Sequence, residues 1–111
     1  MVEIIVKPGI CEKRSEIKAS LLDGNPKDPL EGKVKIELIS ECEGVESFSK
    51  EVNEIDVSVL MESDFTENPV YKMADNCLPH STCPVPCAVL KAMEAEADLA
   101  LEKNVKIEFK E

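Results

Sequence analysis

The feature that most constrains the fold is a change in the spacing of apolar residues at Cys42. Before Cys42, apolar and charged residues alternate in segments 15–22 and 33–39, and segment 2–7 is a run rich in β-branched residues. A period of two is typical of strands with one buried face, whereas apolar residues three or four positions apart, as found after Cys42, are typical of amphipathic helices. The sequence therefore predicts three strands in an antiparallel meander, followed by helices.

Helical spacing continues through most of the second half of the chain. We expect helices over residues 42–55, 68–78 and 84–98. Prolines near the starts of the last two suit the first turn of a helix, while residues 57–64 fit either a short helix or a loop. Residues 105–109 alternate again and predict a final strand. The predicted fold is α+β, in the order β-β-β-α-α-α-β, with an antiparallel sheet of three to four strands and the helices packed on one face.

The domain organisation is simple. No repeat, linker or low-complexity segment divides the chain, so residues 1–111 predict a single α+β domain. A chain of 111 residues can bury a core without disulfide or metal staples. The segment 25–32, rich in turn-forming residues, predicts a surface hairpin connection between the second and third strands.

Composition excludes several classes of function. The formal net charge is −10, from 23 acidic and 13 basic residues, which repels the phosphates of nucleic acids and anionic lipids. There is no Trp, and Tyr71 is the one Tyr, so aromatic platforms for single-stranded nucleic acid are missing as well. Residues 1–7 lack the features of a signal peptide, and no apolar stretch is long enough to span a bilayer. We therefore expect a cytoplasmic protein that binds neither nucleic acid nor membranes.

The chain has five cysteines, an odd number that argues against a disulfide framework in a reducing compartment. Three of them lie at the ends of predicted elements: Cys11 follows the first strand, Cys42 joins the third strand to a helix, and Cys83 precedes the last helix. The first and third strands of a meander run in the same direction, so we expect all three sulfurs to converge at one edge of the sheet. Helix N-termini lower the pKa of thiols, so Cys42 and Cys83 are expected to ionise readily.

His80, the one histidine in the chain, precedes Cys83 by three residues. Together with Cys11, Cys42 and Cys83 it would complete a Cys₃His set, suited to tetrahedral zinc or to an iron–sulfur cluster. Buried or incidental thiols are the alternative interpretation, because free cysteine is among the most buried residue types.

The other two cysteines have different interpretations. Cys77 lies on the apolar stripe of its predicted helix, so we expect it to be buried and to contribute packing only. Cys87 lies one turn after Cys83, where it could supply a further thiolate, resolve an oxidised Cys83, or pack as a small residue beneath the loop. Both residues are reserve ligands for the metal site.

The order of elements, with Cys11 in a turn, Cys42 at a helix start, and His80 and Cys83 before the last helix, resembles the U-type scaffold proteins of iron–sulfur assembly (IscU-like). The resemblance implies three antiparallel strands backed by helices, with three cysteines and a histidine gathered at one tip. It also implies protein partners that deliver or accept metal or sulfur. The chain is similar, in addition, to a group of small uncharacterised prokaryotic proteins with a Pro-Gly-Ile-Cys turn and a Cys-Pro-Val-Pro helix start.

Three functions stay open at this point. The first, which we favour, is a non-enzymatic metal-binding protein that holds an iron–sulfur cluster or zinc as a scaffold or carrier. The second is a thiol-redox or sulfur-transfer protein that uses Cys83 as a nucleophile and Cys87 as its resolving partner. The third is a structural or interaction domain with incidental cysteines. The sequence predicts no catalytic residues, since it contains no Gly-rich phosphate loop and no Ser-His-Asp set, and it leaves the oligomeric state undetermined.

Overall fold

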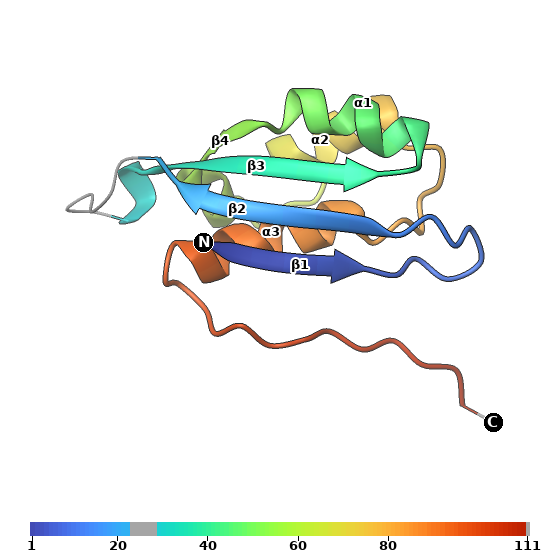
Figure 1. The fold of residues 1–111 in the computed structure, drawn as a ribbon. Coiled ribbons are helices and arrows are strands. Elements are labelled where there is room, and N and C mark those ends of the chain that lie inside the picture. Colours follow the sequence, from blue (N-terminus) through green and yellow to red (C-terminus); the bar gives the residue numbers. More distant parts are fainter. Residues whose placement is uncertain (23–28, 111) are drawn as a thin grey trace.

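The sheet has four strands in the computed structural model, which describes residues 1–22 and 29–110. They are β1 (Val2–Val6), β2 (Ser15–Leu21), β3 (Lys33–Ser40) and β4 (Glu54–Asp56). Every neighbouring pair is antiparallel, in the order β1-β2-β3-β4 (Figure 1). Ile17 of β2 lies opposite Ile4 of β1 and Leu38 of β3, so the register aligns apolar residues of the three long strands on one face.

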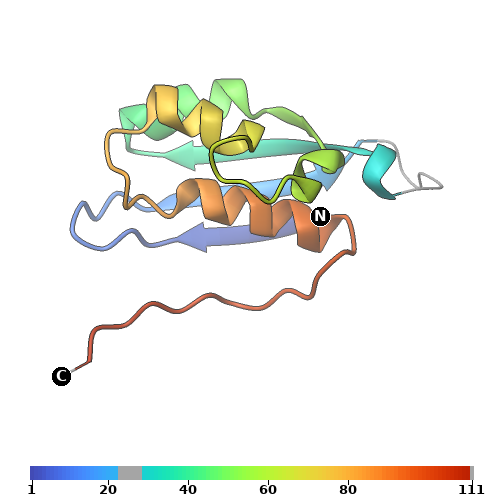
Figure 2. The same cartoon turned by 180° about the vertical axis from the view of Figure 1, so that it is seen from behind.

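In the described part of the chain, three α-helices cover that face of the sheet (Figure 2). They are α1 (Glu43–Glu51), α2 (Pro69–Cys77) and α3 (Val85–Glu96), and two 3₁₀ turns, η1 (Pro29–Glu31) and η2 (Val57–Met61), lie in the connections. α3 packs across β1 and β2, while α1 packs on β3 and against α2. Ile17 of the sheet, Phe48 of α1 and Met93 of α3 are fully buried between these layers, so the predicted apolar faces form the core.

The predicted fold class is confirmed: the fold is α+β, with an antiparallel sheet and the helices on one face. The predicted order of elements is wrong at one point, because the fourth strand is β4 and not residues 105–109. β4 pairs with residues 33–35 of β3, and the carbonyl oxygen of Asn53 accepts from Ile36 N–H at 2.9 Å. The segment after α1 therefore satisfies backbone groups along this edge of β3.

α1 ends earlier than the predicted helix over residues 42–55. Its last residue is Glu51, and Val52 N–H closes on the carbonyl oxygen of Phe48 at 3.1 Å. Ile55, which fits the helical stripe by its spacing, is buried as a residue of β4 instead. The prediction fails here because apolar spacing alone does not separate a continuous helix from a helix, a turn and one buried strand residue.

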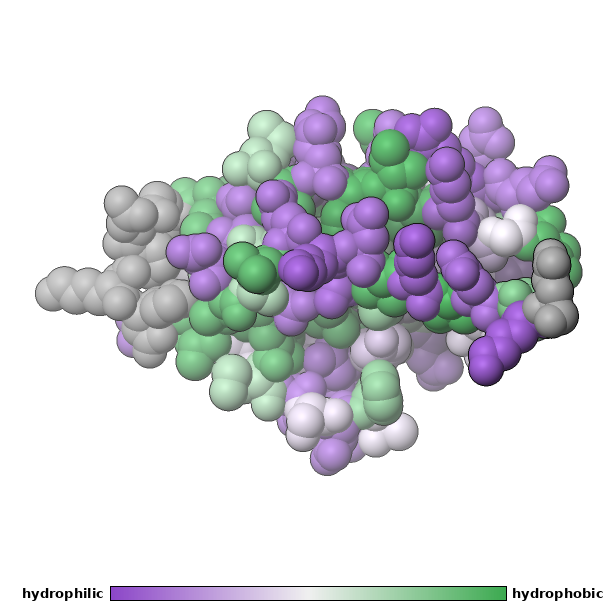
Figure 3. All heavy atoms as spheres, turned by 90° about the horizontal axis from the view of Figure 1, so that it is seen from below, coloured by the Kyte–Doolittle hydropathy of each residue, from purple (hydrophilic) through white to green (hydrophobic). Residues whose placement is uncertain are grey.

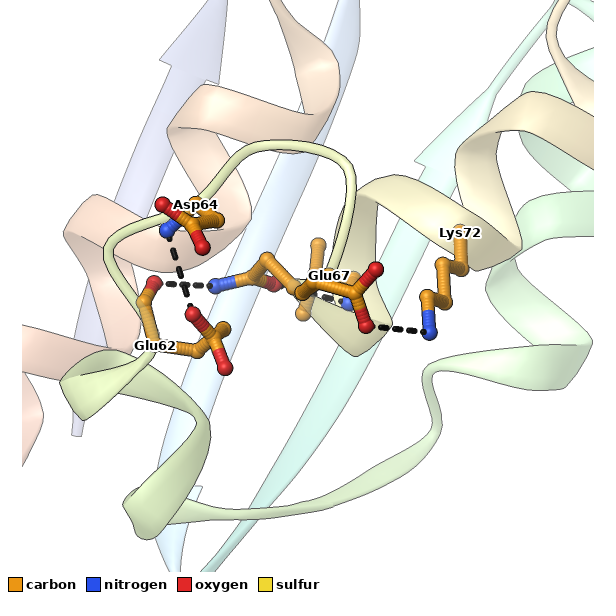
Figure 4. A network of polar contacts seen from close by, with 6 residues as sticks. Glu62, Asp64, Glu67 and Lys72 are labelled. Atoms are coloured by element: carbon orange, nitrogen blue, oxygen red, sulfur yellow. Dashed lines mark hydrogen bonds and ion pairs between the residues drawn. The ribbon is translucent and has the colours of Figure 1, made fainter.

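Residues 57–64, whose sequence fits either a helix or a loop, form η2 and the start of a loop. This loop leads to Asn68, the N-cap residue of α2 (Figure 4). The Asn68 side chain is buried and caps α2, with its Oδ1 accepting from Val70 N–H at 2.9 Å. Its Nδ2 donates to the carbonyl oxygens of Val59 and Glu62 at 3.0 and 3.3 Å. Every hydrogen-bonding atom of this amide is used, so Asn68 has a structural role.

The same loop carries polar contacts on its exposed side (Figure 4). A carboxylate oxygen of Glu62 accepts from Asp64 N–H at 3.1 Å, and Lys72 of α2 pairs with Glu67 at 3.3 Å. Exposed ion pairs of this kind contribute little to the free energy of unfolding, so these contacts hold the loop but do not determine the fold.

Two sequence predictions concern the connections and the membrane. The predicted hairpin connection 25–32 lies partly outside the described residues, which resume at η1. No helix formed by the described residues is both long and apolar enough to cross a membrane.

Glu96, the last residue of α3, fastens this helix to one end of the sheet. One oxygen of its largely buried carboxylate accepts from Leu21 N–H at the end of β2, at 2.8 Å. The other oxygen pairs with the amino group of Met1, at the start of β1, at 3.1 Å. The C-terminal end of α3 is thus fixed here, and its N-terminal end points to the opposite end of the sheet.

Candidate metal centre

One end of the sheet brings together segments that are far apart in the sequence (Figures 1 and 2). β1 and β3 both end here, so the β1–β2 loop (residues 7–14) lies near the junction of β3 with α1. α3 begins at this end, and the loop before it, residues 78–84, reaches the same place. We call this the cysteine end, because it carries Cys11, Cys42 and Cys83, as the predicted topology requires.

Cys42 is held by the backbone at the start of α1. It is the N-cap residue, and its carbonyl oxygen accepts from Glu46 N–H at 2.9 Å. Its own N–H donates to Ser40 Oγ at 3.1 Å, and Ser40 Oγ also accepts from the hydroxyl of Ser15 at 2.8 Å. Ser15 is almost fully buried, so this short chain of hydrogen bonds ties Cys42 to the interior. Its half-buried sulfur is the fixed point of the cysteine end.

Cys11 lies in a tight turn within the β1–β2 loop. Glu12 N–H donates to the carbonyl oxygen of Gly9 at 3.0 Å, and both residues have positive φ, 54° for Glu12 and 95° for Gly9. A glycine adopts such a φ without strain, so Gly9 suits the place where the chain reverses. The turn leaves the Cys11 side chain exposed.

Cys83 lies on a turn just outside α3. Its N–H donates to the carbonyl oxygen of His80 at 3.2 Å, which closes the turn over residues 80–83. α3 begins at Val85, whose backbone N–H donates to the Cys83 sulfur. The sulfur is half-buried, while His80 is exposed at the start of the turn.

Burial and three neighbouring groups act on the pKa of the Cys83 thiol. Burial raises the pKa of the Cys83 thiol above its ordinary value, and the Val85 N–H lowers it. The charges of Cys42 and Cys11, which belong to the same end of the sheet, raise this pKa further. The expected lowering of the Cys83 pKa is therefore wrong, because burial outweighs the single backbone donor.

The thiols do not form a ready-made set of ligands. Sulfurs that share one zinc ion lie about 4 Å apart, since each Zn–S bond is about 2.3 Å long. Within residues 1–22 and 29–110, no three His, Cys, Asp or Glu side chains are arranged to hold a metal ion. The backbone of Cys42 is held by a hydrogen bond to Ser40, whereas Cys11 and His80 are exposed on loops.

Gly44 joins two parts of the cysteine end by close packing. A Cβ atom added at Gly44 would lie 2.8 Å from the carbonyl oxygen of Cys77 and 2.8 Å from Cδ of Pro79. The first turn of α1, next to Cys42, therefore packs directly on the backbone that leads from α2 to the turn at His80. Sequence patterns did not reveal this contact, because a glycine inside a helix gives no sign of what approaches it.

Residues 2–109 match the model of a family of unknown function (DUF6951). The chain belongs to this family. No curated protein matches the chain, and neither does any solved structure. The family match covers the whole cysteine end and continues past α3 to residue 109.

The two remaining cysteines of this DUF6951 member lie on helices. Cys77, at the end of α2, is half-buried and not fully buried as expected. Burial raises the pKa of the Cys77 thiol, and both the charge of Glu51 and a hydrogen bond with it raise this pKa further. Cys87 is exposed on α3, where its charge acts on Tyr71 of α2. All five cysteines are free.

Proposed function

We propose that this protein binds a thiophilic metal, zinc or an iron–sulfur cluster, through Cys11, Cys42 and Cys83, with His80 as the fourth ligand. The observation that carries the proposal is the topology of the cysteine end. Cys11, Cys42 and Cys83 come from three distant segments that meet at this end of the sheet, and the charges of Cys42 and Cys11 add to burial in raising the pKa of Cys83. A cation would stabilise the thiolate forms of these cysteines, and soft sulfur ligands favour zinc and iron–sulfur clusters.

The chemistry of binding follows from the same geometry. A metal takes the thiolate form of each cysteine, so loading releases the proton that Cys83 holds tightly in the free protein. Affinity therefore rises with pH until this thiol is ionised without the metal. Cys42 provides the fixed ligand, and movement of residues 7–14 and 78–84 would bring Cys11 and His80 inward. A site that closes with its loops suits a scaffold or carrier that must also release its cargo.

Two features support metal binding over the thiol-redox alternative. A nucleophilic cysteine needs a lowered pKa, whereas burial raises the pKa of Cys83. The proposed resolving thiol, Cys87, is exposed on α3 and acts on Tyr71, while Cys42 and Cys11 are the thiols that act on Cys83. The arrangement thus favours a ligand set over a nucleophile with a resolving partner.

The cellular role we propose is that of the U-type scaffolds, which the order of elements resembles. In this role the protein is not an enzyme, and partner proteins deliver and accept the metal or the sulfur. The five free thiols suit the reducing conditions of the cytoplasm, where we place the protein. Isolation of the protein from cells under a thiol-blocking reagent tests this location, because oxidised cysteines would contradict it.

The decisive experiment is metal and sulfide analysis of protein purified without oxygen. We expect either about one zinc per chain, or iron with an equal amount of sulfide. The variants Cys11→Ser, Cys42→Ser and Cys83→Ser should each lose most of the bound metal. Cys87→Ser is the matched control, because it removes a thiol outside the trio and should keep the metal. A metal-free wild-type protein that takes up neither zinc nor a reconstituted cluster would overturn the proposal.

A further inference from the structure

The C-terminal tail, residues 101–110, is extended and lies outside the sheet. It leaves α3 at the end fixed by Glu96 and runs below β1, apart from it in both views (Figures 1 and 2). Among the described residues, no backbone hydrogen bond joins this tail to a strand. The family match continues to residue 109, so the tail belongs to the sequence that defines the family.

The tail has the composition of a strand with one apolar face. Val105, Ile107 and Phe109 are 57%, 92% and 101% exposed, and they alternate with charged residues. β-branched and aromatic residues with a period of two are typical of a half-buried strand. Three such side chains in water lose the free energy that burial would provide. The tail is thus an extended segment with the residue pattern of a strand, and it pairs with no described strand of its own chain.

The matching partner surface is the free edge of β1. β1 pairs with β2 along one edge, and no described strand covers its other edge. An uncovered edge presents unpaired backbone N–H and C=O groups to any extended segment. β1 contains no Pro and no Lys, Glu3 is its one charged residue, and Ile5 is 54% exposed on the open face. Figure 3 shows the molecule from below, the side on which the tail lies, where hydrophobic and hydrophilic residues are mixed.

The directions of the two segments select a second copy of the chain as the partner. The tail runs in the same direction as β1 of its own chain (Figure 1). Pairing within one chain would therefore be parallel. A two-fold axis perpendicular to the sheet reverses the direction, so that the tail of a second copy lies antiparallel to β1. Antiparallel pairing is the more stable arrangement per residue and matches the rest of this sheet.

We propose that the protein forms a symmetric dimer in which residues 105–109 of each copy pair antiparallel with β1 of the other. One register places all the apolar residues of the tail opposite those of β1 on the helix-covered side. Its pairs are Val2 with Phe109, Ile4 with Ile107, and Val6 with Val105.

The open face of the same register is compatible with pairing. Glu3 lies opposite Glu108 there, but Lys106 and Lys110 are its diagonal neighbours and are long enough to reach it. The dimer extends the hydrophobic layer under α3 and covers the free edge. It involves no cysteine, so it stands independently of the metal proposal.

Sedimentation analysis of the metal-free protein in the presence of a chelator tests the dimer. We expect a dimer at micromolar concentrations. Ile107→Asp should weaken association by roughly a hundredfold or more, because in the dimer it places a charge in the apolar layer formed by the tail of one copy and β1 of the other. Ile107 is exposed within its own chain, so this variant still folds. Lys106→Gln, on the other face of the tail, is the matched control and should stay dimeric.

A mixture of isotope-labelled and unlabelled protein then locates the contact. Intermolecular nuclear Overhauser effects between Ile107 of one copy and Ile4 of the other are the expected result. A monomeric wild-type protein would overturn the proposal. A dimer that survives Ile107→Asp, or contacts between the tail and β1 within one chain only, would overturn it equally.

Discussion

The two ends of the sheet differ in how far their polar side chains are paired within the chain. At one end, Glu96 uses both carboxylate oxygens within the chain, one on Leu21 N–H and one on the amino group of Met1. At the cysteine end, burial raises the pKa of the Cys83 thiol, and the charges of Cys42 and Cys11 raise it further. The fold therefore completes the polar contacts of Glu96 at the first end and gathers three free cysteines at the second. Shifted pKa values are typical of functional sites, and our proposal accordingly puts the metal at the cysteine end.

The largest effect is expected for Gly44→Ala. The new Cβ would lie 2.8 Å from the carbonyl oxygen of Cys77 and from Cδ of Pro79, so the loop toward His80 must shift. Overpacking of this kind costs roughly 1–3 kcal/mol, and the shift should also weaken zinc binding. Chemical denaturation and zinc titration measure the two effects. Ser47→Ala, on the exposed side of α1, is the control, and equal behaviour of the two variants would contradict the close packing.

At the opposite end, Glu96→Ala should reduce the free energy of unfolding by roughly 1–2 kcal/mol. The substitution leaves Leu21 N–H without its acceptor and releases the end of α3. Zinc binding should be unchanged, because the cysteine end is not touched. Glu94→Ala is the matched control, since Glu94 makes a partly exposed ion pair with Lys91 and should cost less. A loss of zinc affinity in Glu96→Ala would show that the two ends are coupled.

A smaller effect is expected for Cys77→Ala. The half-buried sulfur contributes packing, so its removal should cost no more than about 1 kcal/mol. Bound metal should stay in place, in contrast to the three variants of the cysteine trio. Metal analysis beside thermal unfolding measures both. If this variant lost its metal while the fold stayed intact, Cys77 would belong to the site.

The smallest effect concerns Tyr71, which reports on Cys87. Burial, followed by the charge of Cys87, raises the pKa of the Tyr71 hydroxyl above its ordinary value. The folded protein then holds this proton more tightly than the unfolded chain does. Its contribution to stability is therefore complete below about pH 10 and is lost as the pH rises through the folded pKa.

Tyr71 is the one Tyr of the chain, so ultraviolet absorbance follows its ionisation directly. Cys87→Ser should lower its titration midpoint slightly, and Cys11→Ser should leave it unchanged. An unchanged midpoint in Cys87→Ser would show that the charge of Cys87 does not act on Tyr71.

Much of the cysteine end follows from sequence reasoning. Segments 2–7, 15–22 and 33–39, joined by short turns, predict a three-strand meander whose first and third strands run in the same direction, and this brings Cys11 and Cys42 to one end. The features that shape the site in detail were not predictable. The buried hydroxyl of Ser15 that supports Ser40, and the approach of Pro79 to Gly44, depend on contacts between segments distant in sequence.

The sequence by itself determined the class of the fold, because period-two and helical spacing specify which faces must be buried before any contact forms. It also determined that the cysteines of the trio lie at element ends. The tertiary structure alone decided which segment became the fourth strand. Residues 54–56 and 105–109 can both extend, but a strand exists only where an edge with free backbone groups is within reach, and β3 offers its edge to the first segment. The tertiary structure also decided that Cys83 is half-buried. Burial raises the pKa of this thiol, whereas a position at the start of a helix predicts a lowered pKa.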